Sequence, residues 1–224
     1  MLSIIVPALN EQNRIIESVN EAIAAANDLS IDYEIILVDD GSIDSTWETM
    51  QSFKNSNKKV KAIKNPANLG IGASYKIGLI HANGDFVTWV PADLSHKKDS
   101  LVDAYSMLWS ADMIIPLPSN PHVRSIQRQF ISKMFTFIVN YGSGLRIPYY
   151  NGLSVHRREL LNKIEIHSVG FGFQAEIIVK LLKQGATYRI VNTFIDERKE
   201  GKSKALTFRN FKEVAMTISR IFSG

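Results

Sequence analysis

Short apolar runs rich in Ile and Val alternate with segments of helical periodicity along the first half of the chain. Such runs read as buried strands, and they cover residues 2–7, 33–38, 60–63, 85–90 and 111–117. Between them, apolar residues at spacings of three and four predict helices at 12–26, 45–53, 71–82 and 98–109. This alternation predicts an α/β fold, with a mostly parallel central sheet, helices on both faces and right-handed crossovers.

The regular alternation of predicted strands and helices ends at about residue 118, where a loop that contains proline begins. The pattern then predicts an amphipathic helix at 125–141, a strand near 152–156, a helix near 173–184 and a strand at 187–194. A final helical stripe is formed by Phe208, Phe211, Val214, Ala215, Ile218, Ile221 and Phe222. We expect one continuous fold, because single cores commonly reach about 250 residues before they split.

Composition excludes several classes of protein. With 45% apolar and 21% charged residues, the chain of 224 residues is neither disordered nor fibrous. The absence of cysteine excludes disulfides, iron–sulfur clusters and thiolate zinc sites, and a net charge of +4 is too small to indicate nucleic acid. The start MLSIIVPALNE has no basic stretch, so we expect no signal peptide, and the uncharged run Met134–Leu145 falls short of the ~20 residues of a spanning helix. We expect a protein that is soluble or rests on a membrane surface.

Acidic residues follow two of the predicted strands, at the edge where α/β sheets bind their ligands. Asp39 and Asp40 end the second strand and precede Gly41, which suits a carboxylate that accepts a hydrogen bond from a base or ribose. The alternative is a surface turn in which Asp44 caps the next helix. Asp93 follows the fourth strand, where a divalent ion bound to a diphosphate would lie, although a lone Asp before a helix is usually a cap.

Two familiar phosphate-binding motifs are missing. No glycine lies between Pro7 and Arg14, so the first turn cannot be the G-x-G-x-x-G of a dinucleotide oxidoreductase. The tripeptide 201–203, Gly-Lys-Ser, matches the end of a P-loop, but residue 196 is Asp instead of Gly and the segment follows a late strand. We therefore expect neither a dehydrogenase nor an ATPase.

The motifs in their order resemble family 2 glycosyltransferases of the GT-A fold: PALNE, VDDGSIDST, NPANLGIGAS, GDFVTWVPADLSH, NGLSVHRRELL, GFGFQAEI and ERKEGKSKA. The resemblance spans residues 3 to about 205 and is greatest to enzymes that move a sugar from a nucleotide diphosphate to a polyprenol phosphate, such as dolichol phosphate. It implies a GT-A domain at 1–205, with a nucleotide-binding half at 1–95 and an acceptor-binding half at 96–205, followed by an amphipathic helix at 206–224.

The resemblance also assigns roles to residues. It implies that the nucleotide is held by Pro7, Glu11, Val38, Asp39, Asp40 and Ala92. Asp93 corresponds to the last acid of the family's D-x-D, and Ser95 to a further ligand of Mg2+ or Mn2+. The loop R-x-x-G-x-S-K, which closes over the diphosphate and the acceptor phosphate, is matched by Arg198, Gly201, Ser203 and Lys204. Their cations suit phosphate oxygens, while Glu197 and Glu200 leave a solvated charged loop as the alternative.

Two departures from the family pattern affect these roles. The first acid of the D-x-D is Pro91, so we expect weaker metal binding that depends on the donor, because Mg2+ can use one carboxylate with phosphates and waters. His96 could lend a nitrogen to Mn2+ or be polar surface. In the segment IPYYNGL, the acid and the Ser or Thr usual in these enzymes are absent, which leaves the acceptor open.

The acceptor decides the chemistry. A polyprenol phosphate has a second pKa near ~6 and needs no general base. A sugar hydroxyl needs one, and Glu176 is the candidate, with an ion pair to Lys180 at i+4 as the equal alternative. Either route is a single displacement, so we expect inversion at the anomeric carbon, with Asp93, Arg198 and Lys204 at the reacting phosphates.

The helix at 125–141 has apolar residues on more than one face, with Arg124, Arg128 and Lys133 nearby. This composition suits a lipid headgroup boundary, a core or a dimer interface. Our first hypothesis is an inverting transferase that uses a UDP- or GDP-sugar and a polyprenol phosphate, in the cytoplasm and peripheral on the inner membrane face. The alternatives are a soluble family 2 transferase acting on a sugar hydroxyl and, because of Pro91, a non-catalytic binding subunit. Self-association stays open.

Overall fold

The structure, a computed structural model, describes residues 1–195 and 208–223. The strands are β1 (Leu2–Ala8), β2 (Tyr33–Asp39), β3 (Val60–Lys64), β4 (Phe86–Trp89), β5 (Met113–Pro118), β6 (Val155–Arg157) and β7 (Tyr188–Thr193). The helices are α1 (Ile15–Asp28), α2 (Thr46–Ser56), α3 (Ile71–Ile80), α4 (Lys98–Ser106), the short 3-10 turn η1 (Pro121–Val123), α5 (Ile126–Ser143), α6 (Arg158–Leu161), α7 (Phe173–Lys183) and α8 (Phe208–Ser223). Within these ranges, no helix is long and apolar enough to span a bilayer.

The described strands form one sheet of seven in the order β3-β2-β1-β4-β6-β5-β7. Strands β3, β2, β1 and β4 pair in parallel, as do β5 and β7, while β6 runs antiparallel to both β4 and β5. The predicted mostly parallel sheet is therefore confirmed. Because β6 is reversed, it begins at the edge where β4 and β5 end. The loop that leads into β6 therefore lies at the edge where ligands of parallel sheets bind.

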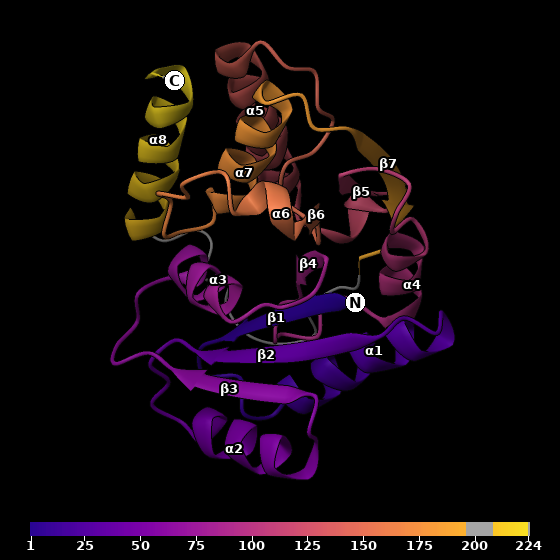
Figure 1. The fold of residues 1–224 in the computed structure, drawn as a ribbon. Helices are drawn as coiled ribbons and strands as arrows, with labels where there is room; N and C mark the ends of the chain where they lie inside the picture. Colours follow the sequence, from indigo (N-terminus) through magenta and orange to yellow (C-terminus); the bar gives the residue numbers. More distant parts are fainter. Residues whose placement is uncertain (196–207, 224) are drawn as a thin grey trace.

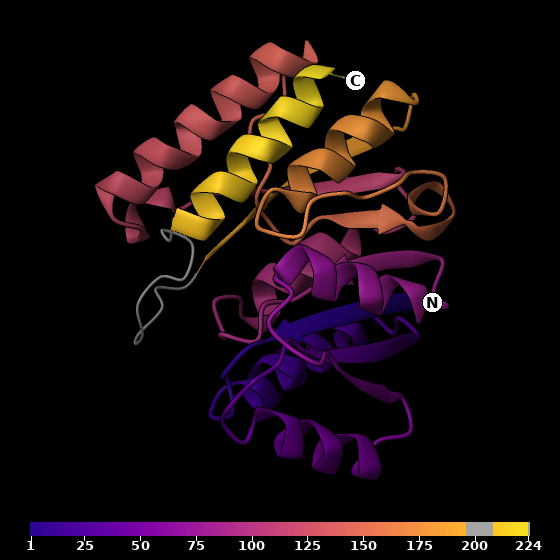
Figure 2. The ribbon, with the colours of Figure 1, turned by 90° about the vertical axis from the view of Figure 1, so that its left-hand side faces the viewer.

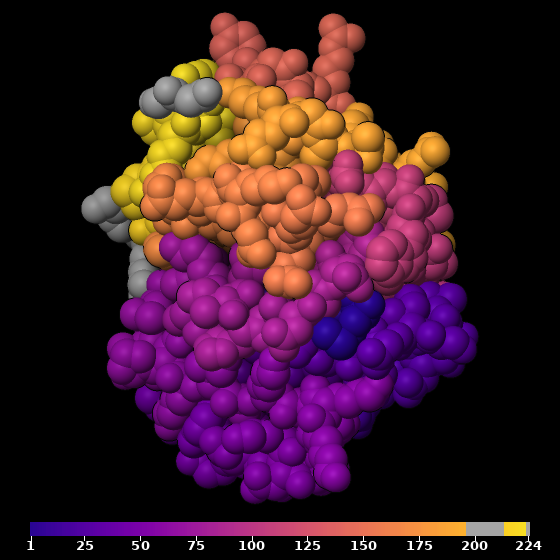
Figure 3. Space-filling view, viewed as in Figure 1, coloured from indigo at the N-terminus to yellow at the C-terminus, as the bar shows by residue number. Residues whose placement is uncertain are grey.

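Apolar side chains alternate along β1 and build a core on each face of the sheet (Figure 1). Ile4 and Val6 belong to one cluster with residues of α1 and α4, whereas Ile5 belongs to another with residues of α3, α6 and α7. Gly78 of α3 is required by this packing, because a Cβ there would lie 2.5 Å from Cγ2 of Ile5. The helices thus cover both faces, as the sequence predicts. On the face shown in Figure 3, the first and second halves of the chain are in continuous contact.

A third cluster joins α5, α7 and α8, through Phe135, Val139, Ile178 and Ile221. Figure 2 shows these three helices side by side, with α8 between α7 and α5 and α5 outermost. Helix α5 is capped at its start by Ser125, whose hydroxyl accepts the Arg128 amide, and at its end by Gly144, which has a left-handed φ of 72°.

The loop from α5 to β6 is held by one side chain of the helix. The Nδ2 of Asn140 donates to the Ile147 carbonyl at 2.9 Å, and its Oδ1 accepts the Ile147 amide at 3.0 Å and the Tyr150 hydroxyl at 2.8 Å. Tyr150 is fully buried, so this clamp lies inside the molecule. The loop therefore has a fixed position relative to α5.

Candidate active site

A cleft of about 690 Å3 opens at the carboxyl ends of β1 and β4, between the two halves of the chain. The first half contributes the segment after β1, the start of α3 and the segment after β4. The second half contributes α5, the loop before β6, the loop before α7 and one turn of α8. The polar and charged side chains that line it are Glu11, Asp40, Asn68, Asp93, Ser95, His96, Arg124, Arg128, Ser132, Tyr149, Asn151, Gln174 and Glu213. Of the described residues with predicted roles, it includes Pro7, Glu11, Asp40, Ala92, Asp93 and Ser95.

Asp40 builds one wall of the cleft. It is buried, and its Oδ1 accepts hydrogen bonds from Asn65 Nδ2 and the Leu69 amide, both at 3.0 Å. Its Oδ2 accepts the Gly70 amide at 3.0 Å, at the start of α3. Gly41 has a φ of 75°, and a Cβ there would lie 2.5 Å from the Ala67 carbonyl carbon, so the turn after β2 packs directly on this loop. The carboxylate therefore fixes the loop before α3, which lines the cleft.

Val38 and Asp39, which were predicted to hold the nucleotide, lie behind this wall. Val38 is fully buried in the core with α3 and α7 and does not line the cleft. Asp39 is also fully buried, and its Oδ1 accepts the Ser42 amide at 3.2 Å. Its Oδ2 has no hydrogen-bond partner among the described residues. A buried carboxylate oxygen without a donor is costly, so Asp39 leaves one acceptor available at the strand end.

Glu11 is held at the cleft by its backbone. Its amide donates to Thr46 Oγ1 at 2.9 Å, and its carboxylate lies 3.8 Å from Arg14. Asp44 accepts the Thr46 amide at 3.0 Å at the start of α2, so the capping proposed as an alternative for this turn does occur. Capping by Asp44 and the wall built by Asp40 exist together.

Asp93, Ser95 and His96 lie together on the cleft floor, after β4. Asp93 Oδ1 accepts the Ser95 amide at 3.2 Å, and the carbonyl of Pro91 accepts the Ser18 hydroxyl at 2.7 Å, which ties this segment to α1. His96 is buried, not polar surface, and its Nδ1 has no hydrogen-bond partner within the described part of the chain. Burial lowers the pKa of His96 to about 4; the Arg124 charge acts in the same direction and Asp93 opposes it. The imidazole is therefore neutral at pH 7.

These residues fit a divalent ion in only a limited way. Over residues 1–195 and 208–223, no group of three or more His, Asp or Glu side chains could hold a metal. The donors present are the Asp93 carboxylate, the Ser95 hydroxyl and the unpartnered Nδ1 of His96. One carboxylate is enough for Mg2+ when substrate phosphates and waters complete its shell.

Glu176, the candidate base, lies outside the cleft. Its side chain is 1% exposed; it pairs with Lys180 Nζ at 2.7 Å and accepts the amides of His167 and Ser168 at 3.0 and 2.8 Å. Burial alone would raise the pKa of Glu176, but the Lys180 ammonium and these donors outweigh it and lower the pKa to about 2. The alternative ion pair is thus the observed one, and Glu176 holds the loop before α7 in place. We do not retain it as a base.

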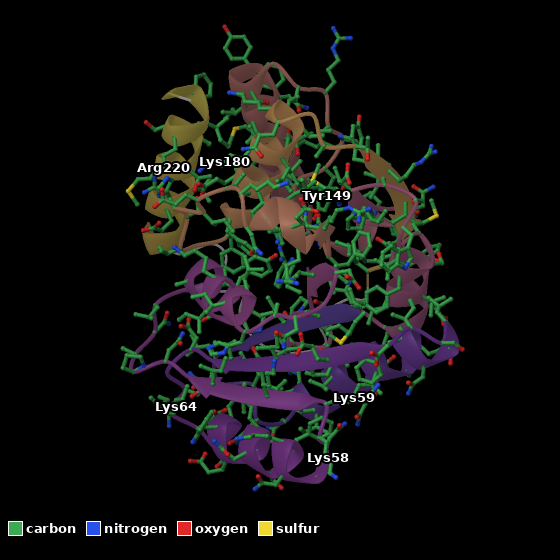
Figure 4. The ribbon with its side chains drawn as sticks, viewed as in Figure 1. Lys58, Lys59, Lys64, Tyr149, Lys180 and Arg220 are labelled. Atoms are coloured by element: carbon green, nitrogen blue, oxygen red, sulfur yellow. The ribbon has the colours of Figure 1, made fainter. Side chains whose placement is uncertain are left out.

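The cleft wall formed by the second half of the chain contains residues to which the sequence assigned no role in the site. Arg124 Nη1 donates to the Tyr149 hydroxyl at 2.7 Å, which joins the segment before α5 to the loop before β6. Figure 4 labels Tyr149. Gln174 of α7 lines the cleft although it is 1% exposed, and its Oε1 lies 3.3 Å from Nε2 of buried His156. Its Nε2 has no partner among the described residues and is a donor that a ligand could use. In the sequence, only the basic residues Arg124, Arg128 and Lys133 indicated that this part of the chain could bind an anion.

The predicted phosphate loop, Arg198, Gly201, Ser203 and Lys204, lies outside the described residues. The described chain leaves the sheet at Ile195, whose amide and carbonyl pair with the Asn120 side chain at 2.9 and 2.8 Å. It returns in α8, where Glu213 and Val214 line the cleft.

Comparison with known proteins supports a single family. Residues 3–158 match the family "Glycosyl transferase family 2". A dolichyl-phosphate beta-glucosyltransferase of Trichomonas vaginalis is 29% identical over 133 residues, which are 55% of this chain and 40% of that protein. One from Dictyostelium discoideum is 38% identical over 99 residues, 41% of this chain and 30% of that protein. The chain thus spans less than half the length of these two relatives.

Solved structures share the fold. Glucosyl-3-phosphoglycerate synthase from Mycobacterium tuberculosis, in complex with Mn2+, UDP-glucose and phosphoglyceric acid, has a TM-score of 0.75 and 17% identity. The match covers 100% of this chain and 80% of that one. TarS residues 1–349 from S. aureus, in complex with UDP-GlcNAc, has a TM-score of 0.68 and 21% identity, and the match covers 98% of this chain and 66% of that one.

Proposed function

The chain belongs to glycosyl transferase family 2 and has a GT-A fold, and from that premise we propose that it transfers a sugar from a UDP- or GDP-sugar to a polyprenol phosphate, with inversion. The observation that carries this proposal is the cleft, where Asp93 on the strand-end floor faces a wall that contains Arg124 and Arg128. Nucleotide sugars and lipid phosphates are both anionic, and Arg can bind two of their oxygens at once. The names of the relatives, which are dolichyl-phosphate glucosyltransferases, support the acceptor class.

On the donor side, we propose that the base and ribose contact the segment after β1 and the loop fixed by Asp40, while Asp39 supports this wall from behind. Pro7, Glu11 and Ala92 are carried forward in this role because they line the cleft. A divalent ion held by Asp93, Ser95 and the substrate phosphates would neutralise charge on the leaving diphosphate. Arg198 and Lys204 remain proposed to close over the phosphates, as the family motif implies.

A phosphate acceptor suits the groups in this cleft. A phosphomonoester dianion attacks without a general base, so the protein has only to align it, keep water out and stabilise the leaving group. Glu176 is not available to deprotonate a hydroxyl, because its carboxylate is 1% exposed and paired with Lys180. Asp40, which does line the cleft, already accepts three hydrogen bonds. We propose that transfer takes place at the cytoplasmic membrane face, where such lipids lie.

The test measures transfer from radiolabelled UDP- and GDP-hexoses to undecaprenyl phosphate, and to free saccharides, with Mn2+ or with chelator. We expect lipid product only, and a loss of about a hundredfold or more in the variant Asp93→Asn. Asp99→Asn, in the exposed first turn of α4 and outside the cleft, is the matched control and should keep full activity. A donor at 100 times its dissociation constant should also raise stability by about 2.7 kcal/mol.

Two results would contradict this function. Product on saccharides but not on the lipid would assign the chain to a soluble transferase that acts on a hydroxyl. Donor binding without transfer or hydrolysis, unchanged in Asp93→Asn, would assign it to a binding subunit, which the proline at residue 91 already raised as an alternative.

A further inference from the structure

One side of α5 exposes a line of large apolar side chains. Ile126, Phe130, Phe137 and Tyr141 are 83%, 66%, 70% and 77% exposed, and Met134 is 44% exposed. Their spacings of four, four, three and four residues place them on one face of the helix. We call these five residues the α5 stripe. Single exposed apolar residues are ordinary, whereas a stripe along an 18-residue helix marks a surface that binds something apolar.

The other side of the same helix belongs to the cleft and the core. Phe135 and Val139 are buried against α7 and α8, and Arg128, Ser132 and Phe135 line the cleft. Ile131 lines the cleft and is also 41% exposed, so the cleft wall and the stripe meet along one edge of α5. Helix α5 is the outermost of the three helices (Figure 2). Most of the stripe is exposed, and Tyr141 contacts Phe222 of α8, with the ring centroids 6.3 Å apart.

The charged residues of the segment that contains α5 have one sign. Between Asp112 and Glu159 the sequence contains no acidic residue, and the basic residues on or next to α5 are Arg124, Arg128, Lys133 and Arg146. Lys133 and Arg146 are exposed. The surface near α5 is therefore both apolar and positive, which is the combination that binds anionic lipid headgroups and the acyl boundary beneath them.

We propose that α5 docks this protein on an anionic phospholipid surface, with the α5 stripe in the headgroup–acyl boundary and Lys133 and Arg146 against lipid phosphates. The proposal rests on the proposed function, because it gives the route by which a lipid acceptor reaches the cleft. Arg124 and Arg128 lie where α5 borders the cleft, so a phosphate at headgroup level would meet them first. A second copy of the chain fits less well, since pairing two α5 faces would bring Lys133 and its neighbours against cations of the same sign.

The test is sedimentation of the full chain with vesicles of phosphatidylcholine containing 30% phosphatidylglycerol, and with phosphatidylcholine alone. We expect binding to the anionic vesicles that weakens with salt. The double variant Phe130→Ser with Phe137→Ser should bind about tenfold or more weakly, and Lys133→Ala about fivefold more weakly. The matched control, Ile43→Ser with Ile80→Ser, removes two apolar side chains that are 94% and 79% exposed elsewhere and should bind like the wild type. Nucleotide-sugar binding in solution, followed by thermal shift, should be unchanged in every variant.

Each result either supports the proposal or overturns it. Loss of binding in the stripe variant but not in the control supports it. The proposal falls if the wild type ignores anionic vesicles, if both double variants bind alike, or if the stripe variant only converts a dimer to a monomer in light scattering. The proposed function fails separately: stripe-dependent binding without sugar transfer would leave the docking surface standing, and transfer to a detergent-solubilised acceptor without vesicle binding would leave the function standing.

Discussion

The two halves of the chain treat their polar and apolar side chains differently. In the first half, buried carboxylates find their partners inside the chain: Asp40, at the cleft, accepts three hydrogen bonds, and Glu34, at the opposite end of β2, accepts from Ser3, Lys61 and Asn83. In the second half, α5 borders the cleft with one face and leaves apolar side chains such as Phe137 and cations such as Lys133 exposed on the other. The first half is therefore preorganised by its own hydrogen bonds, whereas the outer face of α5 is open to an external partner.

The largest effect should come from breaking the wall that Asp40 builds. Asp40→Ala removes a buried carboxylate that accepts from Asn65 and from the partly buried amides of Leu69 and Gly70, and we expect a loss of about 4 kcal/mol in the free energy of unfolding. Urea denaturation measures it. The control is Asp32→Ala, whose side chain is 66% exposed and pairs with Lys59 (Figure 4); it should leave the free energy of unfolding nearly unchanged. Equal losses in the two variants would mean that Asp40 does not hold this wall.

The second prediction compares two ion pairs, each between a Glu and the Lys four residues after it. Glu176 is buried and pairs with Lys180, whereas Glu159 is exposed and pairs with Lys163 at 2.6 Å. At pH 7, Glu176→Gln should lower the free energy of unfolding by about 3 kcal/mol, whereas Glu159→Gln should leave it nearly unchanged.

The pH dependence of the Glu176 contribution has a definite sign. Its pKa falls from the ordinary 4.5 to about 2 on folding, so the contribution is complete above pH 4.5 and is lost as the pH falls toward 2. The difference between wild type and Glu176→Gln should therefore shrink over this window. A difference that does not change from pH 7 to pH 3 would contradict the assigned role.

A smaller effect, on substrate binding, is expected from the hydrogen bond between Arg124 and Tyr149 in the proposed acceptor wall. Tyr149→Phe removes only the hydroxyl that accepts from Arg124, and we expect about a fivefold higher KM for the lipid acceptor with an unchanged KM for the nucleotide sugar. Steady-state kinetics with each substrate varied in turn makes the measurement. A rise in the donor KM instead would move Arg124 to the donor side.

The smallest effect on stability should come from the α5 stripe. Phe137 is 70% exposed, so Phe137→Ser should change the free energy of unfolding by less than about 0.5 kcal/mol. Phe135, two residues away, is 7% exposed, and Phe135→Ser should cost about 3 kcal/mol. If Phe137→Ser were as costly as Phe135→Ser, the stripe would be part of the core.

Most of the fold could be predicted from the sequence, because each apolar run is local and has a clear period. The second predicted strand at 33–38 is observed at Tyr33–Asp39, and the helix predicted at 71–82 is observed at Ile71–Ile80. The four-residue α6 and the three-residue η1 are too short to show a period. The direction of β6 was not predicted either, because pairing depends on distant strands and not on the run itself.

From the sequence, only those site residues that directly follow a strand could be predicted. The sequence located Asp93 and Asp40 at the right edge, but the adjacent Val38 and Asp39 lie behind the wall, because local pattern does not state which side chain faces the ligand. The acceptor wall depends on contacts between distant segments, such as Arg124 with Tyr149, which no local motif encodes.

The Asn140 clamp gives α5 a mechanical role. Because Asn140 binds both Ile147 and Tyr150, the helix and the loop that carries Tyr149 move as one body. If α5 lies in the bilayer as proposed, a rotation of the helix would move this loop with it and would change the width of the opening through which an acceptor reaches the cleft. Bilayer composition would then tune the turnover rate without any regulator binding to the protein.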